Sequence, residues 1–308
     1  DDFVDLCRGP HVESTKYLRS FAYKINKVAG AYWRGNEKNK MLQRVYVYGF
    51  ASKDALKDYM HMMEEAAKRD HRKLGKELQL FFISEYSKGM PTYMPKGLIL
   101  KNELIKYWRE LHQKAGYVEI ETPMAMNRQL WEISGHWDHY KDNMYTFKCE
   151  DDTFAIKPMN CPGGMLYYMQ SKHSYKEFPL RVGELGKVHR HEASGTLSGL
   201  LRVRCFTQDD AHIFMLPSQI ESEIKGVMAL VDKVYSTFGL KYSVELSTMP
   251  DNHIGEISEW QMAETALENA LKHMNLDYKI NPGDGAFYGP KIDIHVKDCI
   301  GREWQCGT

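Results

Sequence analysis

The sequence lacks a long hydrophobic run, a net charge and a paired cysteine motif, and each absence excludes a class of protein. No stretch approaches the roughly 18 consecutive apolar residues that a membrane-spanning helix needs, so we expect no membrane partner. Lysine plus arginine equals aspartate plus glutamate, at 41 each, and no overall field draws the chain to DNA. A polyanionic partner would therefore have to bind at a local patch.

The six cysteines are scattered, and none forms the CxxC pair typical of zinc ribbons and redox sites. Such usage indicates reduced thiols, and we expect a cytoplasmic protein. The composition, with 43% hydrophobic and 12% aromatic residues, predicts a globular chain. A length of 308 residues predicts more than one domain.

Hydrophobic spacing predicts helices and strands in an order without a regular βαβ rhythm. A charged amphipathic segment over 51–78 is expected to form a connector helix, with Ser52 as its N-cap. A second helix is expected through Leu100 and Leu111 and should end at Gly116. Further helices are predicted over 219–238 and 258–274. Strands are predicted over 118–122, 152–157, 181–190, 241–248 and 286–297, the last split by Gly289-Pro290. This mixture predicts an α+β fold with an antiparallel sheet.

The most informative segment runs from Arg202 to Ile213, where residue types alternate. As a strand, it would place two arginines, a ring, an amide, a carboxylate and an imidazole on one face: Arg202, Arg204, Phe206, Gln208, Asp210 and His212. One alternative is an antiparallel strand whose polar face simply meets solvent. Because the row contains no Lys or Glu, we interpret it instead as the floor of a site for a phosphate, a flat base and a small polar molecule.

Arg190 and Glu192 precede a loop rich in glycine and serine, residues 193–199, that leads toward this row. An arginine beside a glutamate is usually an ordinary surface pair. Opposite the row, however, the pair suits ATP. Arg190 would bind the α-phosphate, Glu192 the adenine amino group, and Phe206 would stack on the base.

Arg190-His191-Glu192, the loop, Arg202 and Phe206 together resemble motif 2 of the class II aminoacyl-tRNA synthetases, and residues 116–126 are similar to their motif 1. The segments 157–163 (Lys-Pro-Met-Asn-Cys-Pro-Gly), 207–214 and 285–291 narrow the resemblance to the threonyl-tRNA synthetase family. The resemblance implies a class II catalytic core over 79–308, an antiparallel sheet flanked by helices. It also implies that residues 1–50 are the remnant of an α+β editing domain.

The resemblance further implies an ATP-dependent ligase that activates L-threonine as threonyl-adenylate and transfers it to tRNA(Thr), with Mg²⁺ accompanying ATP. The implied catalytic residues are Arg190, Gln208 and Lys291; ATP would contact Arg190, Glu192, Arg202, Phe206 and Gln305, and threonine would contact Met159, Gln208, Asp210 and Tyr288. Motif 1 lies at a dimer interface in this family, so a homodimer is expected. The alternative is a synthetase-derived protein that binds threonine or ATP without charging tRNA.

Cys161 and His212 have no recognisable zinc spacing when taken alone. By resemblance they match two of the three zinc ligands of the family's catalytic site, and the third, a histidine, is expected beyond Thr308. Zinc would serve specificity, because a pocket based on shape rejects a near-isosteric side chain by only about 10²-fold. A metal with an open position can instead require the threonine hydroxyl, which valine lacks. Serine keeps that hydroxyl, and we expect the site to accept serine to some extent as well.

Residues 5–11 (Asp-Leu-Cys-Arg-Gly-Pro-His) resemble one half of the family's editing site, through Cys7 and His11. Pro10 argues against a helix that would put both side chains on one face. The other half of that site is expected upstream and the motif 3 arginine downstream, so we expect the 308-residue chain alone to be weakly active or inactive and not to edit. A zinc hydrolase built on Cys7 and His11 is a weaker alternative, because no HExxH-type pair accompanies them.

Overall fold

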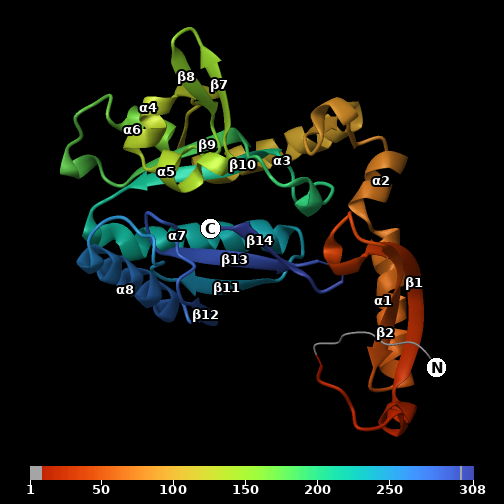
Figure 1. Ribbon diagram of the computed structural model, residues 1–308. Coiled ribbons are helices and arrows are strands. Elements are labelled where there is room, and N and C mark those ends of the chain that lie inside the picture. The colour runs from red at the N-terminus through yellow and green to blue at the C-terminus, as the bar shows by residue number, and fades with distance from the viewer. Residues whose placement is uncertain (1–8, 299) are drawn as a thin grey trace. The chain divides into compact units, whose positions relative to one another are not determined.

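The computed structural model describes residues 9–298 and 300–308, and its contacts divide the chain into two units between Arg69 and Asp70. Unit 1 contains the short 3₁₀ helices η1 (Thr15–Ser20) and η2 (Trp33–Gly35), the strands β1 (Ala22–Tyr32) and β2 (Met41–Phe50), and the helix α1 (Lys53–Lys68). The two strands form an antiparallel hairpin that runs from the Ala22–Phe50 pair to the Tyr32–Met41 pair, with a shift of register between Ile25 and Lys27 (Figure 1).

The connector expected over 51–78 consists of two helices rather than one. The predicted N-cap is confirmed, because the Ser52 hydroxyl accepts a hydrogen bond from the Ala55 N–H at 3.1 Å. α1 ends at Lys68, and α2 (His71–Glu77) begins with a cap of its own. There the Asp70 carboxylate accepts the Arg72 N–H at 2.8 Å. A new N-cap at this point starts a second helix and so interrupts the first.

Unit 2 begins with α2, the short hairpin of β3 (Phe81–Ile83) and β4 (Pro91–Tyr93), and the long helix α3 (Pro95–Lys114). The predicted end of α3 is confirmed. Gly116 has a φ of +81°, the left-handed conformation that suits a residue just past a helix, and the Tyr117 N–H donates back to the His112 carbonyl at 2.9 Å.

The sheet that carries the candidate site pairs β10 (Cys205–Phe214) with β9 (Leu180–His189) antiparallel and β9 with β5 (Val118–Glu119) parallel. α3 lies along one face of this sheet (Figure 1). Its Lys101 Nζ donates to the Thr207 hydroxyl at 3.3 Å, and its Trp108 ring lies where a Cβ on Gly183 would approach to 3.1 Å. Because strand side chains alternate, even-numbered residues of β10 point to the opposite face.

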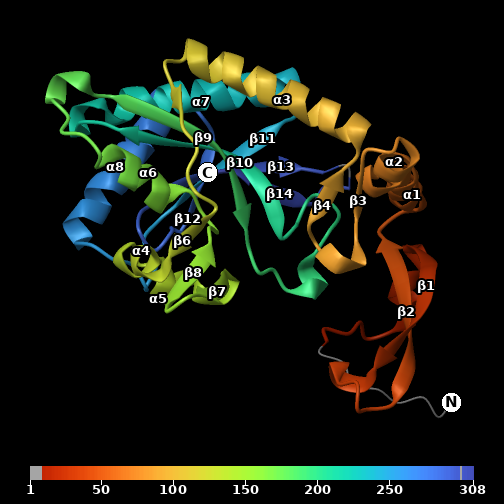
Figure 2. The same ribbon diagram turned by 90° about the horizontal axis from the view of Figure 1, so that it is seen from above.

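A second sheet has the order β12-β11-β13-β14, with β12 parallel to β11 and the other pairs antiparallel. Its strands are β11 (Tyr242–Ser247), β12 (Tyr278–Asn281), β13 (Lys291–Lys297) and β14 (Glu303–Gly307). Met228 of α7 (Ile220–Thr237) and Leu271 of α8 (Ile257–His273) form one buried cluster with Val244, Leu246, Ile292 and Ile294. α7 also runs beside α3 (Figure 2), where the Tyr107 and Thr237 hydroxyls are 2.8 Å apart.

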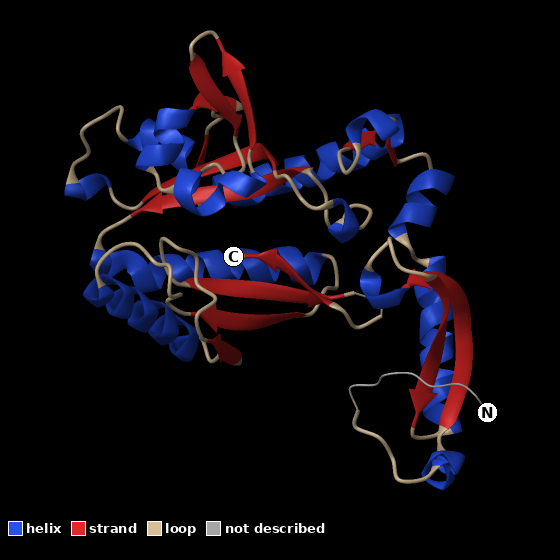
Figure 3. Cartoon of the chain, viewed as in Figure 1, coloured by secondary structure: helices blue, strands red, loops and turns tan. Residues whose placement is uncertain are grey.

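The third sheet of unit 2 has the order β6-β8-β7, from β6 (Ala125–Asn127), β7 (Tyr145–Cys149) and β8 (Asp152–Ile156). Two short helices, α4 (Arg128–Ile133) and α5 (His136–Tyr140), follow β6 (Figure 3). Trp131 and Trp137 of these helices are buried with Met126, Met144 and Ala155. After β8 the chain enters α6 (Cys161–Tyr168).

The α+β class is confirmed, as are the two helices predicted over 219–238 and 258–274. The break predicted at Gly289-Pro290 is confirmed, because Ala286 and Gly289 form a turn closed by a hydrogen bond of 3.2 Å and β13 begins at Lys291. The strand predicted over 118–122 is only the two residues of β5. No helix within residues 9–298 and 300–308 is long and apolar enough to cross a membrane.

Two helical glycines give opposite expectations for alanine substitution. A Cβ on Gly97 of α3 would overlap the Leu80 carbonyl oxygen, whereas a Cβ on Gly226 of α7 meets no atom within 4 Å. We expect Gly97→Ala to destabilise unit 2 by about 1–3 kcal/mol. Gly226→Ala should stabilise it by roughly 0.5–1 kcal/mol, because alanine reduces the freedom of the unfolded chain. Urea unfolding midpoints of the two variants test this, and equal shifts of the same sign would contradict it.

Candidate active site

Arg190 and Phe206 form the end of the candidate site that suits a nucleotide. The Arg190 guanidinium carbon lies 5.1 Å from the centroid of the Phe206 ring, a cation–π contact. Its Nε donates to the Pro158 carbonyl at 3.1 Å, which holds the side chain in place. A planar cation beside an accessible ring offers a phosphate partner and a stacking surface to one ligand.

The amide of Asn160 joins the next two residues of the row. Its Nδ2 donates to the Asp210 carboxylate at 3.0 Å and to the Gln208 Oε1 at 3.3 Å. Asn160 is completely buried, and it crosses β9 at Gly186, where any Cβ would overlap the amide. Sequence reasoning assigned Asn160 no role. Its position next to Cys161, a predicted zinc ligand, was the one signal in the sequence. The partners of Asn160 could not be predicted, because they depend on the register of β9 and β10.

Cys161 and His212 both adjoin the first turn of α6. Cys161 is the first residue of this helix, and the His212 Nδ1 would be 2.9 Å from a Cβ on Gly164 of the same helix. Burial raises the pKa of the Cys161 thiol to about 11, and the nearby Asp210 carboxylate adds to the shift. A thiolate and an imidazole are donors that zinc prefers, so the pair fits part of a zinc site. Within the described residues, no group of three or more His, Cys, Asp and Glu side chains is arranged to hold a metal.

Tyr288, in the segment that precedes β13, lies near Cys161 and Asp210. Partial desolvation, followed by the influence of Cys161 and Asp210, raises the pKa of its phenol to about 12. The residue is nevertheless 54% exposed, so it lies beside these groups with much of its ring open to solvent. At neutral pH its hydroxyl is a hydrogen-bond donor as well as an acceptor. Met159, the remaining predicted threonine contact, is half-buried between Pro158 and Asn160.

The loop between β9 and β10 differs from the simple alternation predicted from the sequence. β10 begins at Cys205, so Arg202 and Arg204 precede the strand, and the row on its face starts at Phe206. Arg204 instead braces the loop, donating to the Glu192 carbonyl at 2.9 Å and to the Ser194 hydroxyl at 3.2 Å. The physical reason is a Ser198–Arg202 bridge, which folds the chain back before the strand starts.

Arg202 and Glu192, which were assigned to different parts of ATP, bind each other. The Arg202 Nη2 lies 2.9 Å from the Glu192 Oε2. The arginine side chain is 52% exposed and the glutamate 16% exposed. Because the arginine end of this pair is open to solvent, Arg202 can exchange its partner for a ligand at small cost.

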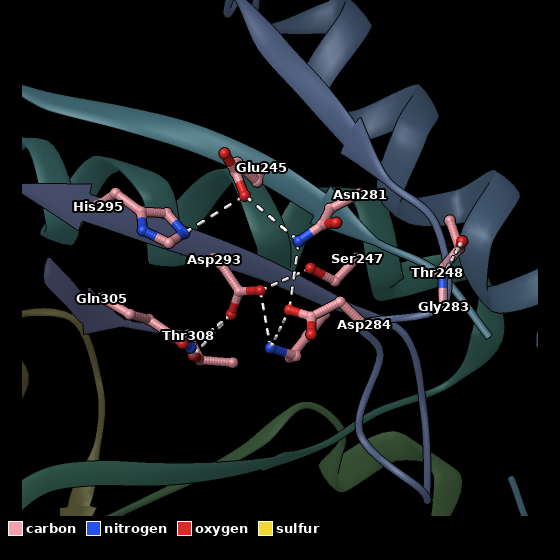
Figure 4. A network of polar contacts seen from close by, with 11 residues as sticks. Glu245, Ser247, Thr248, Asn281, Gly283, Asp284, Asp293, His295, Gln305 and Thr308 are labelled. Carbon is pink, nitrogen blue, oxygen red and sulfur yellow. Dashed lines mark hydrogen bonds and ion pairs between the residues drawn. The ribbon is translucent and has the colours of Figure 1, made fainter. Parts of the chain in front are cut away.

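Lys291 and Gln305 form a separate cluster around Asp293 of β13. Figure 4 shows Gln305, Thr308 and Ser247 around this carboxylate. The Asp293 carboxylate is 1% exposed and accepts hydrogen bonds from four groups. The donors are the Ser247 hydroxyl at 2.6 Å, the Lys291 ammonium at 2.8 Å, the Gln305 amide at 2.6 Å and the Thr308 hydroxyl at 3.0 Å. Sequence reasoning missed Asp293, whose apolar neighbours Ile292 and Ile294 read as an ordinary strand. Tyr288 lies three residues before Lys291 and leads from this cluster toward Cys161.

A buried ion pair supports the segment that carries Asn160 and Cys161. The Lys157 ammonium lies 2.7 Å from the Glu184 carboxylate, and both side chains are 2% exposed. Thr122 completes the contact, because its hydroxyl accepts from Lys157 at 2.8 Å and its N–H donates to Glu184 at 3.0 Å. Glu184 is the register partner of Asp210, so the ion pair fixes residue 157 next to the middle of β9.

Of the two residues proposed for the editing site, one lies within the described part of the chain. His11 is exposed, and Cys7 lies outside the described residues.

Comparison with known proteins gives a family match over the same site. The tRNA synthetase class II core domain (G, H, P, S and T) matches residues 145–308, more than half of the chain. The chain belongs to this class II synthetase family. Residues 1–46 match the second additional domain of threonyl and alanyl tRNA synthetases. The predicted class II resemblance and core fold are therefore confirmed.

Relatives within the class II family include threonine–tRNA ligases that match along the whole chain. Those of Clostridioides difficile and Acetivibrio thermocellus are each 63% identical over 307 residues, which is 100% of this chain and 48% of each relative. The chain thus spans about half the length of these curated relatives. The RNA-binding domain of a Cryptosporidium parvum threonyl-tRNA synthetase superposes with a TM-score of 0.75 at 43% identity, covering 77% of this chain and 60% of that one.

The raised pKa of Cys161 predicts slow alkylation in the metal-free folded chain. With a pKa of about 11 the thiolate fraction at pH 8 is roughly 10⁻³. The exposed Cys149 should therefore react with iodoacetamide at least about 100-fold faster, a ratio that shrinks as pH rises toward 11. Peptide mass spectrometry measures both rates. The two thiols should react alike in urea, and equal rates in the folded chain at pH 8 would contradict the assignment.

Proposed function

We propose that this chain is the catalytic part of a threonine–tRNA ligase, which activates L-threonine with ATP and transfers it to tRNA(Thr). The observation that carries the proposal is the row on one face of β10, where Arg190 and Phe206 adjoin the Asn160–Gln208–Asp210 contacts. Groups that suit a nucleotide thus lie next to groups that suit a small polar molecule, along the same strand. Both reactants of an adenylation would meet between them.

The proposed chemistry needs positioning rather than a side-chain nucleophile. The threonine carboxylate attacks the α-phosphorus of ATP, the bond to the β-phosphate oxygen breaks, and pyrophosphate leaves. The adenylate then acylates a ribose hydroxyl at the end of the tRNA, and AMP leaves. Arg190 and Arg202 would neutralise phosphate charge, and Mg²⁺ bound with ATP would do the same.

The nucleotide contacts follow from the geometry of motif 2. Phe206 would stack on adenine, and Arg190, held by the Pro158 carbonyl, would reach the α-phosphate. Glu192 would accept the adenine amino group while Arg202 turns toward the phosphates. Lys291 and Gln305 would act from the neighbouring sheet, where Asp293 orients both before ATP arrives.

Asn160 determines how Gln208 would present itself to threonine. The Asp210 carboxylate only accepts hydrogen bonds when ionised, so the nitrogen of the Asn160 amide must face it. The same nitrogen donates to the Gln208 Oε1, which leaves the Gln208 NH₂ as the donor for a substrate oxygen. Asp210 would accept from threonine, with Met159 and Tyr288 completing the contacts.

Cys161 and His212 are the residues of this chain that would hold zinc. When bound, the metal would supply an open coordination position that requires the amino and hydroxyl groups of the amino acid. Within the described residues, no third ligand adjoins this pair. His212 is held against Gly164 of α6, the helix that begins at Cys161.

The proposed domain organisation places part of an editing domain at 1–50, a connector at 51–78 and the catalytic core at 79–308. The division of contacts between Arg69 and Asp70 falls inside the connector. A homodimer through motif 1 is also proposed, in a cytoplasmic enzyme. Its support is the exposed apolar side chains of Val118 and Met124 within residues 116–126, which are 52% and 40% exposed. The preceding helix α3 adds exposed apolar surface, since Leu98, Ile99, Leu100 and Leu104 are each 46–64% exposed.

Threonine-dependent exchange between ATP and pyrophosphate tests the proposed function in the complete protein with zinc and Mg²⁺ supplied. Arg190→Ala should lower kcat/KM by about 10²–10³-fold, since it removes a cation aimed at the reacting phosphate. Arg128→Ala, which removes an exposed arginine paired with Glu132, serves as the matched control. ATP binding without any threonine-dependent exchange would favour the alternative, a binding protein.

Asn160→Asp tests the threonine end separately. It replaces the donor with a second carboxylate beside Asp210 in a buried position. We expect the KM for threonine to rise about 10²-fold, because a buried charged group left without its partner costs roughly 1–3 kcal/mol or more. The KM for ATP should change far less. Asn275→Asp is the control, since Asn275 is exposed and its φ of +51° suits either residue. A parallel rise in both KM values would point to a general structural defect instead.

A further inference from the structure

His71 of α2 makes a direct contact with the motif 2 loop, which we define as residues 193–204. Its Nε2 accepts a hydrogen bond from the Leu200 N–H at 2.9 Å. Gly199 beside it has a φ of +53°, and a Cβ at that position would overlap the imidazole ring. The loop backbone therefore approaches the ring as closely as a glycine allows.

The imidazole is held from the α2 side as well. Phe81 of β3 stacks on it with centroids 6.4 Å apart and planes 19° apart. The Asp70 carboxylate, which caps α2 and binds the Arg72 side chain at 2.6 Å, lies 3.9 Å from the His71 Nδ1. A proton on Nδ1 toward this carboxylate leaves Nε2 as the acceptor that the Leu200 N–H requires.

The same stretch of unit 2 holds the motif 2 loop at a second place. The Arg204 N–H donates to the Gly89 carbonyl at 2.6 Å, and its guanidinium donates to the Lys88 carbonyl at 3.3 Å. Arg204 in turn binds the Glu192 carbonyl, and Glu192 binds Arg202. Residues 71–89 thus support the loop that presents Arg202 and Glu192.

We propose that His71 is a positioning residue whose neutral imidazole docks the motif 2 loop and so prepares the Arg202–Glu192 pair for ATP. The inference rests on the proposed function for its link to ATP, although the docking itself does not. Protonation would place an N–H on Nε2 opposite the Leu200 N–H, replacing a hydrogen bond with two opposed donors. The docked loop would then be released in acid.

The electrostatic surroundings agree with a neutral imidazole. Burial lowers the pKa of His71, Asp70 raises it and Arg72 lowers it. From β3 the ring meets Phe81, and from the loop it meets the backbone of Gly199 and Leu200. The docked form thus binds fewer protons than the undocked one. Docking should be complete above the ordinary imidazole pKa of about 6.5 and weaken as pH falls through the lowered value.

Hydrogen exchange at the Leu200 amide in the complete, ligand-free protein tests docking without any assay of activity. Wild type should show protection at pH 7 that falls by about fivefold or more near pH 5, after correction for intrinsic exchange. His71→Gln keeps an acceptor near the position of Nε2 and does not titrate, so its protection should not depend on pH. His71→Leu should lose the protection at both pH values. The Gln208 amide of β10 reports whether each variant remains folded.

Kinetics then connect docking to the nucleotide. His71→Leu should raise the KM for ATP about five- to tenfold with the KM for threonine unchanged, and His71→Gln should restore it. His273→Gln, at an exposed histidine paired with Glu221, is the control. Leu200 protection that survives His71→Leu, or a pH dependence that survives His71→Gln, would overturn the docking role. If the wild type shows no threonine-dependent ATP–pyrophosphate exchange, the proposed function is refuted. Docking is still decided by the hydrogen exchange of the Leu200 amide.

Discussion

The antiparallel pairing of β9 with β10 is the interaction on which the candidate site depends. Its register sets Glu184 opposite Asp210 and Gly186 opposite Gln208. A slip by one residue would turn the whole row of side chains to the face that α3 covers. Glycine at 183 and 186 lets Trp108 approach one face and Asn160 the other, where larger residues would clash. The ladder therefore decides which face is packed and which is left for chemistry.

The Lys157–Glu184 ion pair fixes the second wall of the site to this ladder. Removing two charges from water costs several kcal/mol, which the pair recovers only through close contact and added hydrogen bonds. Thr122 supplies those bonds from a third segment. The pair thus selects one position for residues 157–161, and with it one position for Asn160 and Cys161. Such a contact contributes more to specificity of placement than to stability.

The polar residues assigned to ligands are mutually engaged in the absence of any ligand. Arg202 binds Glu192, Lys291 and Gln305 bind Asp293, and Gln208 and Asp210 bind Asn160. Groups oriented beforehand lose less entropy when a substrate arrives. The exposed Arg202–Glu192 pair is the one most easily exchanged, and the buried Asp293 and Asn160 are supports that stay in place.

Local chemistry in the sequence determined the elements with strong periodicity, the cap at Ser52 and the end of α3 at Gly116, because these depend on neighbours within one turn. The motif residues also sufficed to identify the class II resemblance. Tertiary structure decided the rest. Asn160, Asp293, Lys157 and His71 act through partners more than ten positions away, at Asp210, Gln305, Glu184 and Leu200. The alternation from Arg202 likewise failed to predict where β10 starts, because a bridge inside the loop set that point. The spacing of residues along a strand determines which face of the sheet each side chain takes. Only the pairing of strands in the tertiary structure determines which partners that side chain contacts.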